Sequence, residues 1–140
     1  MLVTALIAVS ILLGAMVFFP AVVAPLVFRT LEPAAAGAFL RALFPRYYAF
    51  MIATSGIAGV LLLPSTPVPA LLLLAVAAST LWVRQWLVPK LNGWRDLELA
   101  GDAEAGARFA KGHRLSVIIN VLQLLLILAL LIQQLLALTS

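Results

Sequence analysis

Residues 108–123 read RFAKGHRLSVIINVLQ. The first half of this stretch is basic, and its second half begins the last apolar run of the chain, which continues to Leu138. A run of this length and composition predicts a membrane-spanning helix. At about 3.6 residues per turn, one narrow arc of that helix carries four polar residues: His113, Ser116, Asn120 and Gln123. The sequence therefore predicts a polar stripe that descends from the membrane surface into the bilayer.

The rest of the chain also has the composition of a membrane protein. Of its 140 residues, 65% are hydrophobic and 10% are charged, whereas soluble domains carry about 25% charged residues. Four apolar segments are each long enough to cross a hydrocarbon layer of about 30 Å, at residues 2–28, 45–63, 68–88 and 113–138. A soluble protein of this length lacks the polar surface to cover four buried helices. We expect an all-α fold, with residues 1–140 forming one domain, a four-helix transmembrane bundle.

The N-terminal apolar segment has the small residues that follow a signal peptide, but no Lys or Arg precedes Arg29. Because a signal peptide begins with a basic region, we interpret this segment as a retained helix.

The basic residues predict how the chain sits in the membrane. All nine flank the first and third connections between the apolar segments, which cover residues 29–44 and 89–112. By the positive-inside rule these two connections are cytoplasmic, and both termini and the turn at residues 64–67 lie outside. The same flanking positions account for the net charge of +4, so we expect no nucleic-acid partner. The predicted location is the cell's inner (plasma) membrane, crossed several times.

Prolines mark the expected helix breaks. A proline lacks a backbone donor and disfavours helical geometry in the residue before it. We therefore expect kinks or ends in the first and third helices and a helix start at the second, at these positions: Pro20, Pro25, Pro45 and Pro89.

The two cytoplasmic connections carry helix signals of their own. Glu32-Pro33 predicts the start of a short interfacial helix between the first two membrane helices. In the third connection Asp102 is a predicted helix cap, followed by an ion pair of Glu104 with Arg108 one turn later. The fourth helix is thus expected to begin several turns before the membrane.

His113 is the single histidine and the chain has no cysteine, so thiolate and clustered metal sites are excluded by composition. A histidine at the membrane interface is commonly a polar anchor. It also has the chemistry of a proton shuttle or a haem axial ligand, which needs one imidazole. We predict no metal site and no resident cofactor, with haem as the alternative.

Each polar residue that lies deeper in the predicted helices has two possible roles. Asn120 and Gln123 either hold helices together or line a path for a solute. Arg84, near the cytoplasmic end of the third helix, either extends to the headgroups or marks a functional site. Tyr47 is an interfacial anchor or a ligand contact. Small residues spaced by four predict helix-packing faces within or between chains: Ser10 and Gly14, Ser55 and Gly59, Ala75 and Ser79.

Several blocks of the sequence, in this order and spacing, resemble the transmembrane protein 205-like family: residues 25–31 (PLVFRTL), 36–37 (AG), 43–48 (LFPRYY), 84–90 (RQWLVPK) and 108–120 (RFAKGHRLSVIIN). The resemblance implies a four-helix integral membrane domain of unknown function, with a distant likeness to the copper resistance protein D membrane family. Its positions coincide here with Arg29, Pro45, Tyr47, Arg84, Pro89, His113, Ser116 and Asn120. Copper transfer through sulfur is disfavoured, because the chain has no cysteine and its three methionines form no motif.

These observations favour a membrane protein that binds or conducts a small solute or ion, and no familiar catalytic set is present, so we do not expect an enzyme. The predicted cytoplasm-facing polar cavity is lined by Tyr47, Arg84, His113, Ser116, Asn120 and Gln123. One alternative is a haem-associated or redox subunit with His113 as axial ligand and Arg84 on a propionate. Another is a structural partner in a larger membrane complex. The expected partners are the lipid bilayer and further copies of the chain.

Overall fold

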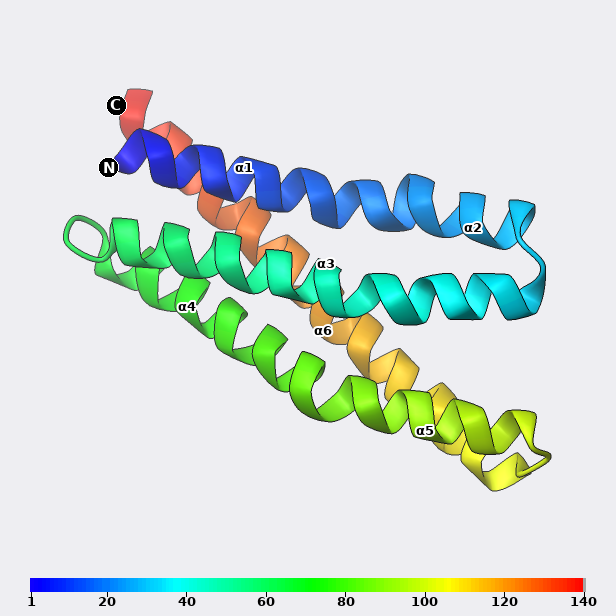
Figure 1. The fold of residues 1–140 in the computed structure, drawn as a ribbon. Helices are drawn as coiled ribbons and strands as arrows, with labels where there is room; N and C mark the ends of the chain where they lie inside the picture. The colour runs from blue at the N-terminus through cyan, green and yellow to red at the C-terminus, as the bar shows by residue number, and fades with distance from the viewer. Residues whose placement is uncertain (140) are drawn as a thin grey trace.

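The computed structural model describes residues 1–139, and within them every regular element is a helix (Figure 1). The elements join into four rods. The first rod contains α1 (Leu2–Phe18), the π-helical turn η1 (Phe19–Val23) and α2 (Ala24–Thr30). The second is α3 (Pro33–Leu62), the third contains α4 (Pro67–Trp82), the π-helical turn η2 (Val83–Leu87) and α5 (Val88–Leu99), and the fourth is α6 (Ala103–Thr139). The prediction of an all-α fold is confirmed.

Successive rods run antiparallel, and this divides the molecule into two ends (Figure 1). The termini end holds Met1, the C-terminal end of α6 and the α3–α4 turn, whereas the connections from α2 to α3 and from α5 to α6 lie at the opposite end. We call the latter the charged end. Helix α3 packs between α1 and α4, and α6 crosses diagonally, contacting α5 at the charged end and α1 toward the termini end.

Three rods have the length and apolar composition needed to cross a membrane: Leu2–Thr30, Pro67–Leu99 and Ala103–Leu138. Helix α3 does not belong to this set. Its sequence places Arg46, Tyr47 and Tyr48 beside its apolar half, and Ser, Thr and Gly residues within it. Because α1 and α4 cover two of its sides, α3 presents less surface to lipid and needs fewer large apolar residues.

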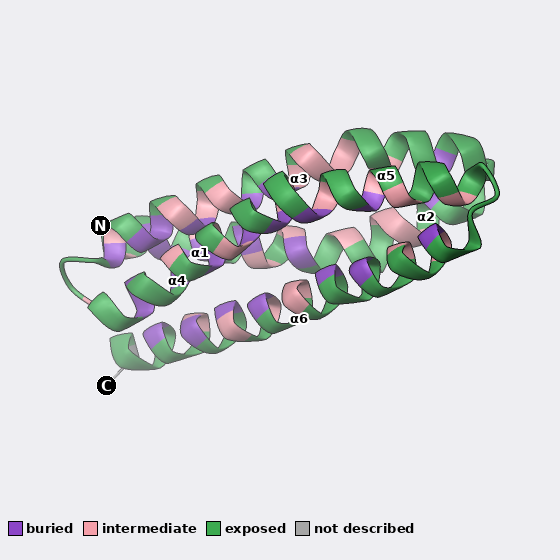
Figure 2. Ribbon diagram, turned by 90° about the horizontal axis from the view of Figure 1, so that it is seen from below, coloured by how far each residue is buried: buried purple, intermediate pink, exposed green. Residues whose placement is uncertain are grey.

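The core lies along the inward faces of the rods, where the largest fully buried side chains are Leu12, Met16, Met51, Leu62, Leu73, Leu87 and Ile127. The outward faces are exposed, as Figure 2 shows in green, and they carry many leucine, isoleucine and phenylalanine side chains. An apolar outside of this extent is expected of helices in contact with lipid.

The prediction of a separate interfacial helix in the first connection is wrong. Residues 33–44 are helical, but they form one continuous helix with residues 45–62. Pro45 lies inside this helix without ending it. Proline costs the helix one backbone donor and a steric clash, and continuous packing on both sides of α3 outweighs that cost.

Pro20, Pro25 and Pro89 do not end their helices either. The chain stays helical past each of them. Pro20 lies inside the π-helical turn η1, Pro25 lies two residues after the end of η1, and Pro89 lies two residues after the end of η2. In both turns the closing N–H reaches the carbonyl five residues back, from Ala24 to Phe19 and from Val88 to Val83. The wider turn makes room for the proline ring, so a bulge replaces the predicted break.

The third connection is a helical hairpin rather than a loop. Helices α5 and α6 meet at a tight turn in which Gly101 has a φ of +104°, a conformation that favours glycine. The Oδ1 atom of Asp102 accepts hydrogen bonds from the N–H groups of Glu104 and Ala105, at 2.9 and 3.0 Å. Glu104 also pairs with Arg108. The predicted cap, the predicted pair and the early start of the fourth helix are confirmed.

The two helical hairpins of the charged end are joined by one ion pair. Arg41 of α3 lies against Asp96 of α5, with 2.6 Å between Nη2 and Oδ1 and 3.3 Å between Nη1 and Oδ2. Both side chains are exposed, so solvent and salt weaken this pair.

The small-residue faces are not used alike. Ser55 and Gly59 are buried, and a Cβ atom on Gly59 would lie 2.9 Å from Cγ of Leu74, so this face brings α3 close to α4, as predicted. Ser10 and Gly14 are exposed, and nothing lies within 4 Å of a Cβ built on Gly14. They do not serve packing within the chain.

Candidate functional site

The interior of the bundle contains polar side chains from α3, α4 and α6. Gln123 of α6 makes the closest contacts, because its Nε2 donates to Ser79 Oγ at 2.8 Å and to Thr80 Oγ1 at 3.1 Å. Both hydroxyls belong to α4, and Gln123 is only 7% exposed. These bonds cross-link the two helices, which otherwise make few contacts. The helix-joining reading of Gln123 is therefore the one that the structure shows directly.

One turn earlier on α6, Asn120 faces α3 instead. Its Nδ2 donates to the thioether of Met51 at 3.8 Å, and sulfur is a weak acceptor. The hydroxyl of Tyr47 lies beside the Asn120 amide, but the two do not meet the geometry of a hydrogen bond. Among the described residues this hydroxyl has no hydrogen-bond partner, although its oxygen is buried. We call Tyr47, Met51 and Asn120 the polar layer.

Aromatic rings form one side of the polar layer. Phe19 in η1 stacks on Tyr47 with 5.0 Å between ring centroids and lies 5.3 Å from Phe44. Tyr48 contacts both Tyr47 and Phe44. The π-helical turn η1 thus carries the aromatic ring that holds Tyr47 in place, which fixes where the unpaired hydroxyl points.

Arg84 contacts α3 close to Tyr47 in the sequence. It is half-buried in η2, and its Nε donates to the backbone carbonyl of Pro45 at 3.0 Å. This hydrogen bond joins η2 to α3 at Pro45, two residues before Tyr47. Arg84 is therefore placed by a protein contact, and the structure does not show it extended along the surface.

The remaining members of the predicted stripe do not join this group. His113 is exposed, and its ring stacks on Phe109 at 5.9 Å with an angle of 8° between the planes. Ser116 is buried, but its Oγ donates to the His113 carbonyl of its own helix at 2.7 Å. Of the six predicted cavity residues, Tyr47, Asn120, Gln123 and Arg84 face other helices, whereas His113 and Ser116 make contacts within α6.

An open groove lies between α4 and α6 beside Gln123. Its volume is about 310 Å³, and its walls are mostly aliphatic, formed by Ala75, Val76, Ser79, Ile119, Leu122, Gln123 and Leu126. Ala75 and Ser79, predicted as a packing face, line this groove. They give it a small-residue floor on the α4 side.

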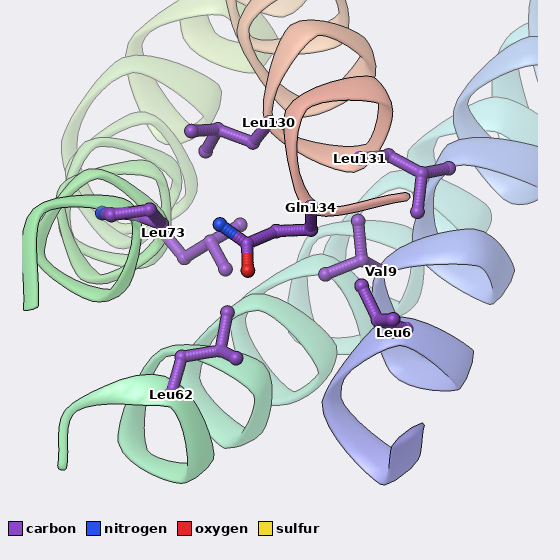
Figure 3. A pocket seen from close by; sticks show the side chains of 8 residues that line it. Leu6, Val9, Leu62, Leu73, Leu130, Leu131 and Gln134 are labelled. Atoms are coloured by element: carbon purple, nitrogen blue, oxygen red, sulfur yellow. The ribbon is translucent and has the colours of Figure 1, made fainter. Parts of the chain in front are cut away.

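A second buried amide escaped the sequence analysis. Gln134 lies three turns beyond Gln123 on the same face of α6 and is also 7% exposed. Figure 3 shows its amide among Leu62, Leu73 and Leu130, at a cavity of about 10 Å³, roughly the volume that one water needs. Thr80 and Met51 were also missed. The spacing of eleven residues from Gln123 to Gln134 is the signal that identifies Gln134 beforehand, since it returns to the same face of a helix.

Within residues 1–139, no group of three or more His, Asp or Glu side chains is placed to hold a metal ion. The haem alternative gains no support from the geometry, because His113 is exposed on the surface and Arg84 is bonded to a backbone carbonyl.

Comparison with known proteins identifies a family but no function. Residues 7–97 match the family described as a domain of unknown function, DUF4149. This match covers the first three rods up to α5, including the aromatic cluster, Arg84 and the hydroxyls that bind Gln123. No curated protein and no solved structure is significantly similar to the chain. The matched segment is about two thirds of the sequence, and the chain belongs to the DUF4149 family of uncharacterised domains.

Proposed function

We propose that the protein is a membrane-embedded binding protein for a small solute, which it holds at the polar layer between α3 and α6. The observation that supports this most strongly is the buried Tyr47 hydroxyl, which has no hydrogen-bond partner among the described residues. Buried polar groups are nearly always paired, with protein or with bound molecules. A hydroxyl and an amide that lie side by side, both poorly paired, form a suitable place for a solute with donor and acceptor groups.

The energetics favour the same proposal. An unpaired hydroxyl in a low-dielectric interior costs about 1–3 kcal/mol, and the thioether of Met51 satisfies the Asn120 amide only weakly. Phenylalanine and leucine would avoid this cost without changing the packing greatly. Keeping Tyr47 and Asn120 here is therefore reasonable when a bound molecule supplies the missing hydrogen bonds.

The proposal includes the membrane arrangement. Helix α3 connects two rods that each have the composition of a membrane span, and it runs from the charged end back to the termini end. A chain that crosses in α1–α2 and again in α4 must return through α3, so we propose four crossings. By the distribution of basic residues, the charged end faces the cytoplasm of a cell bounded by this plasma membrane.

We further propose that the protein conducts the bound solute, assembles into a homo-oligomer or serves as a structural partner in a larger complex. Membership of the transmembrane protein 205-like family is a further proposal. Conduction predicts solute flux into liposomes that depends on Tyr47 and Asn120. Partner binding predicts that the protein extracted in mild detergent migrates as a larger species than one chain.

Native mass spectrometry of the protein, purified from its own host in mild detergent, tests the binding proposal. Wild-type protein is expected to carry a bound mass below about 1 kDa. Tyr47→Phe removes one hydroxyl and should reduce its retention about tenfold, the effect of losing one hydrogen bond in a buried site. Asn120→Leu should reduce it at least as much.

Tyr48→Phe is the matched control, because Tyr48 is the neighbouring buried tyrosine of the same aromatic cluster. It should retain the bound mass. A wild-type protein that carries no bound mass, or a Tyr47→Phe protein that is more heat-stable and retains as much as wild type, contradicts the proposal. In the latter case the hydroxyl is merely unsatisfied.

A further inference from the structure

We infer that the bound molecule is lipid-soluble, carries a hydroxyl or another hydrogen-bond donor, and places its apolar part in the groove between α4 and α6, one turn along α6 from Asn120. This inference rests on the proposed binding function and adds the class of ligand and the place of its apolar part. It is carried by three features: the shape of the groove, the free acceptor of Gln123 and the depth of both.

The shape fits part of an amphiphile. A volume of about 310 Å³ lies at the lower end of the range of about 300–1,000 Å³ found for ligand sites. The groove is open along its length and its walls are aliphatic except at Ser79 and Gln123. An open aliphatic wall suits a chain or ring that remains partly in lipid, and suits a water-soluble ion poorly.

The polar end of the groove offers an acceptor. Gln123 uses both protons of its amide nitrogen on Ser79 and Thr80, and Ser79 directs its own proton to the Val76 carbonyl. The Oε1 atom of Gln123 accepts no hydrogen bond from any described residue. A ligand that donates a hydrogen bond can therefore pair with this oxygen, whereas a ligand that carries only acceptors cannot.

The depth selects molecules that dissolve in hydrocarbon. Gln123 lies seven residues after Ser116, where the apolar part of α6 begins, which is about 11 Å along the helix axis. The groove continues from Ile119 to Leu126 on α6. Leu122, which also lines the groove, is exposed, as expected of a side chain in contact with lipid. A molecule at this position contacts acyl chains on its open side.

A second copy of the chain fits the groove less well. Stable interfaces bury about 800 Å² of each partner, and a groove of this volume receives one or two side chains rather than a helix. We therefore commit to a small amphiphile and treat a second copy as an outcome of the test.

Photolabelling with a matched pair of probes tests the inference. The probes are a hexadecanol that carries a diazirine along its chain and the methyl ether of the same compound, each added to the full-length protein in lipid nanodiscs. The alcohol donates a hydrogen bond and the ether does not. We expect the alcohol to label peptides of α4 and α6 about fivefold more than the ether does.

Two variants separate the hydrogen bond from the space. Gln123→Leu should bring the alcohol-to-ether ratio close to one. Ala75→Phe places a ring in the groove while keeping Gln123, and should lower labelling by both probes several-fold. Gln133→Leu, an exposed glutamine on the same helix, should leave the ratio unchanged.

Equal labelling of wild type by both probes overturns the inference, as does an alcohol preference that survives Gln123→Leu. Cross-linking of the groove to a second copy in place of the probe also overturns it. These results are distinguishable from failure of the binding proposal, because native mass spectrometry of wild type reports a retained mass independently of the groove. If wild-type protein retains a bound mass but shows no preference for the alcohol probe, the binding proposal stands. Only the inference that the ligand is a lipid-soluble hydrogen-bond donor is then rejected.

Discussion

At the residue scale, two glutamines of α6 have the same burial and opposite surroundings. Gln123 donates to two hydroxyls, and Gln134 lies among leucines with no hydrogen bond from or to a described residue. The sequence predicts that Gln123 and Asn120 face the interior, because helical periodicity depends on spacing alone. It does not predict their partners, since Met51, Ser79 and Thr80 lie far along the chain and are brought near only by packing.

The different surroundings of Gln123 and Gln134 predict different effects of leucine substitutions on the stability of the protein. Gln134→Leu should stabilise the protein by about 1 kcal/mol, because it removes an unpaired amide from an apolar site. Gln133→Leu on the exposed face should change the stability little, and Gln123→Leu should destabilise by about 1 kcal/mol through the loss of two hydrogen bonds. Thermal unfolding in detergent measures all three. A loss of stability in Gln134→Leu would mean that this amide has a partner, such as a bound water.

His113 shows the limit of reasoning from a single residue type. Its imidazole made it the natural candidate for chemistry, and a helical arc placed it with Asn120. In the structure, however, His113 is exposed, and its ring stacks on Phe109 of the same helix. Spacing gives the face of a helix, and the neighbouring helices decide which part of that face is covered.

At the element scale, the prolines are the clearest difference between expectation and structure. Proline chemistry predicts a disturbance at each position, and a disturbance is found in the form of η1 and η2 beside Pro25 and Pro89. Whether a helix ends or bulges depends on its packing on both sides of the proline, which local sequence does not contain. The bulges matter for the site, because they carry Phe19 and Arg84 to the level of Tyr47.

Close packing of α3 on α4 provides a test at this scale. A Cβ atom on Gly59 would lie 2.9 Å from Cγ of Leu74 and 3.1 Å from the Ala70 carbonyl oxygen, so Gly59→Ala forces these helices apart. The expected destabilisation is about 1–3 kcal/mol. Gly56→Ala on the same helix has nothing within 4 Å of its Cβ and should keep or raise stability, as alanine favours helices. Equal effects in both variants would contradict the α3–α4 contact.

At the scale of the whole molecule, hydropathy predicted four apolar segments, and three of the helical rods have the length and composition of a membrane span. Figure 1 shows both termini at the same end of the molecule. Charge distribution predicted which connections share an end, and the connections at residues 31–32 and 100–102 do so. The diagonal path of α6 was not predictable. It follows from close packing against α5 at one end and α1 at the other, and it opens the groove beside Gln123.

Single cysteines test the arrangement in the membrane, since the chain has none of its own. Ser65→Cys in the α3–α4 turn should react with a membrane-impermeant maleimide added to intact cells, or to spheroplasts where an outer membrane blocks access. Ala100→Cys at the tip of the α5–α6 hairpin should react only after the cells are opened. Both positions are exposed in the structure, so protection reports the membrane side. Reaction of both from the same side would contradict four crossings.

The most direct test of the binding site is a crystallographic density map from crystals grown in a lipid phase, at a resolution that shows ordered non-protein atoms. We expect density from a non-protein molecule between α3 and α6, within hydrogen-bond distance of the Tyr47 hydroxyl and the Asn120 amide. A Tyr47 hydroxyl that donates to a protein carbonyl, with no further density beside Asn120, would contradict this expectation.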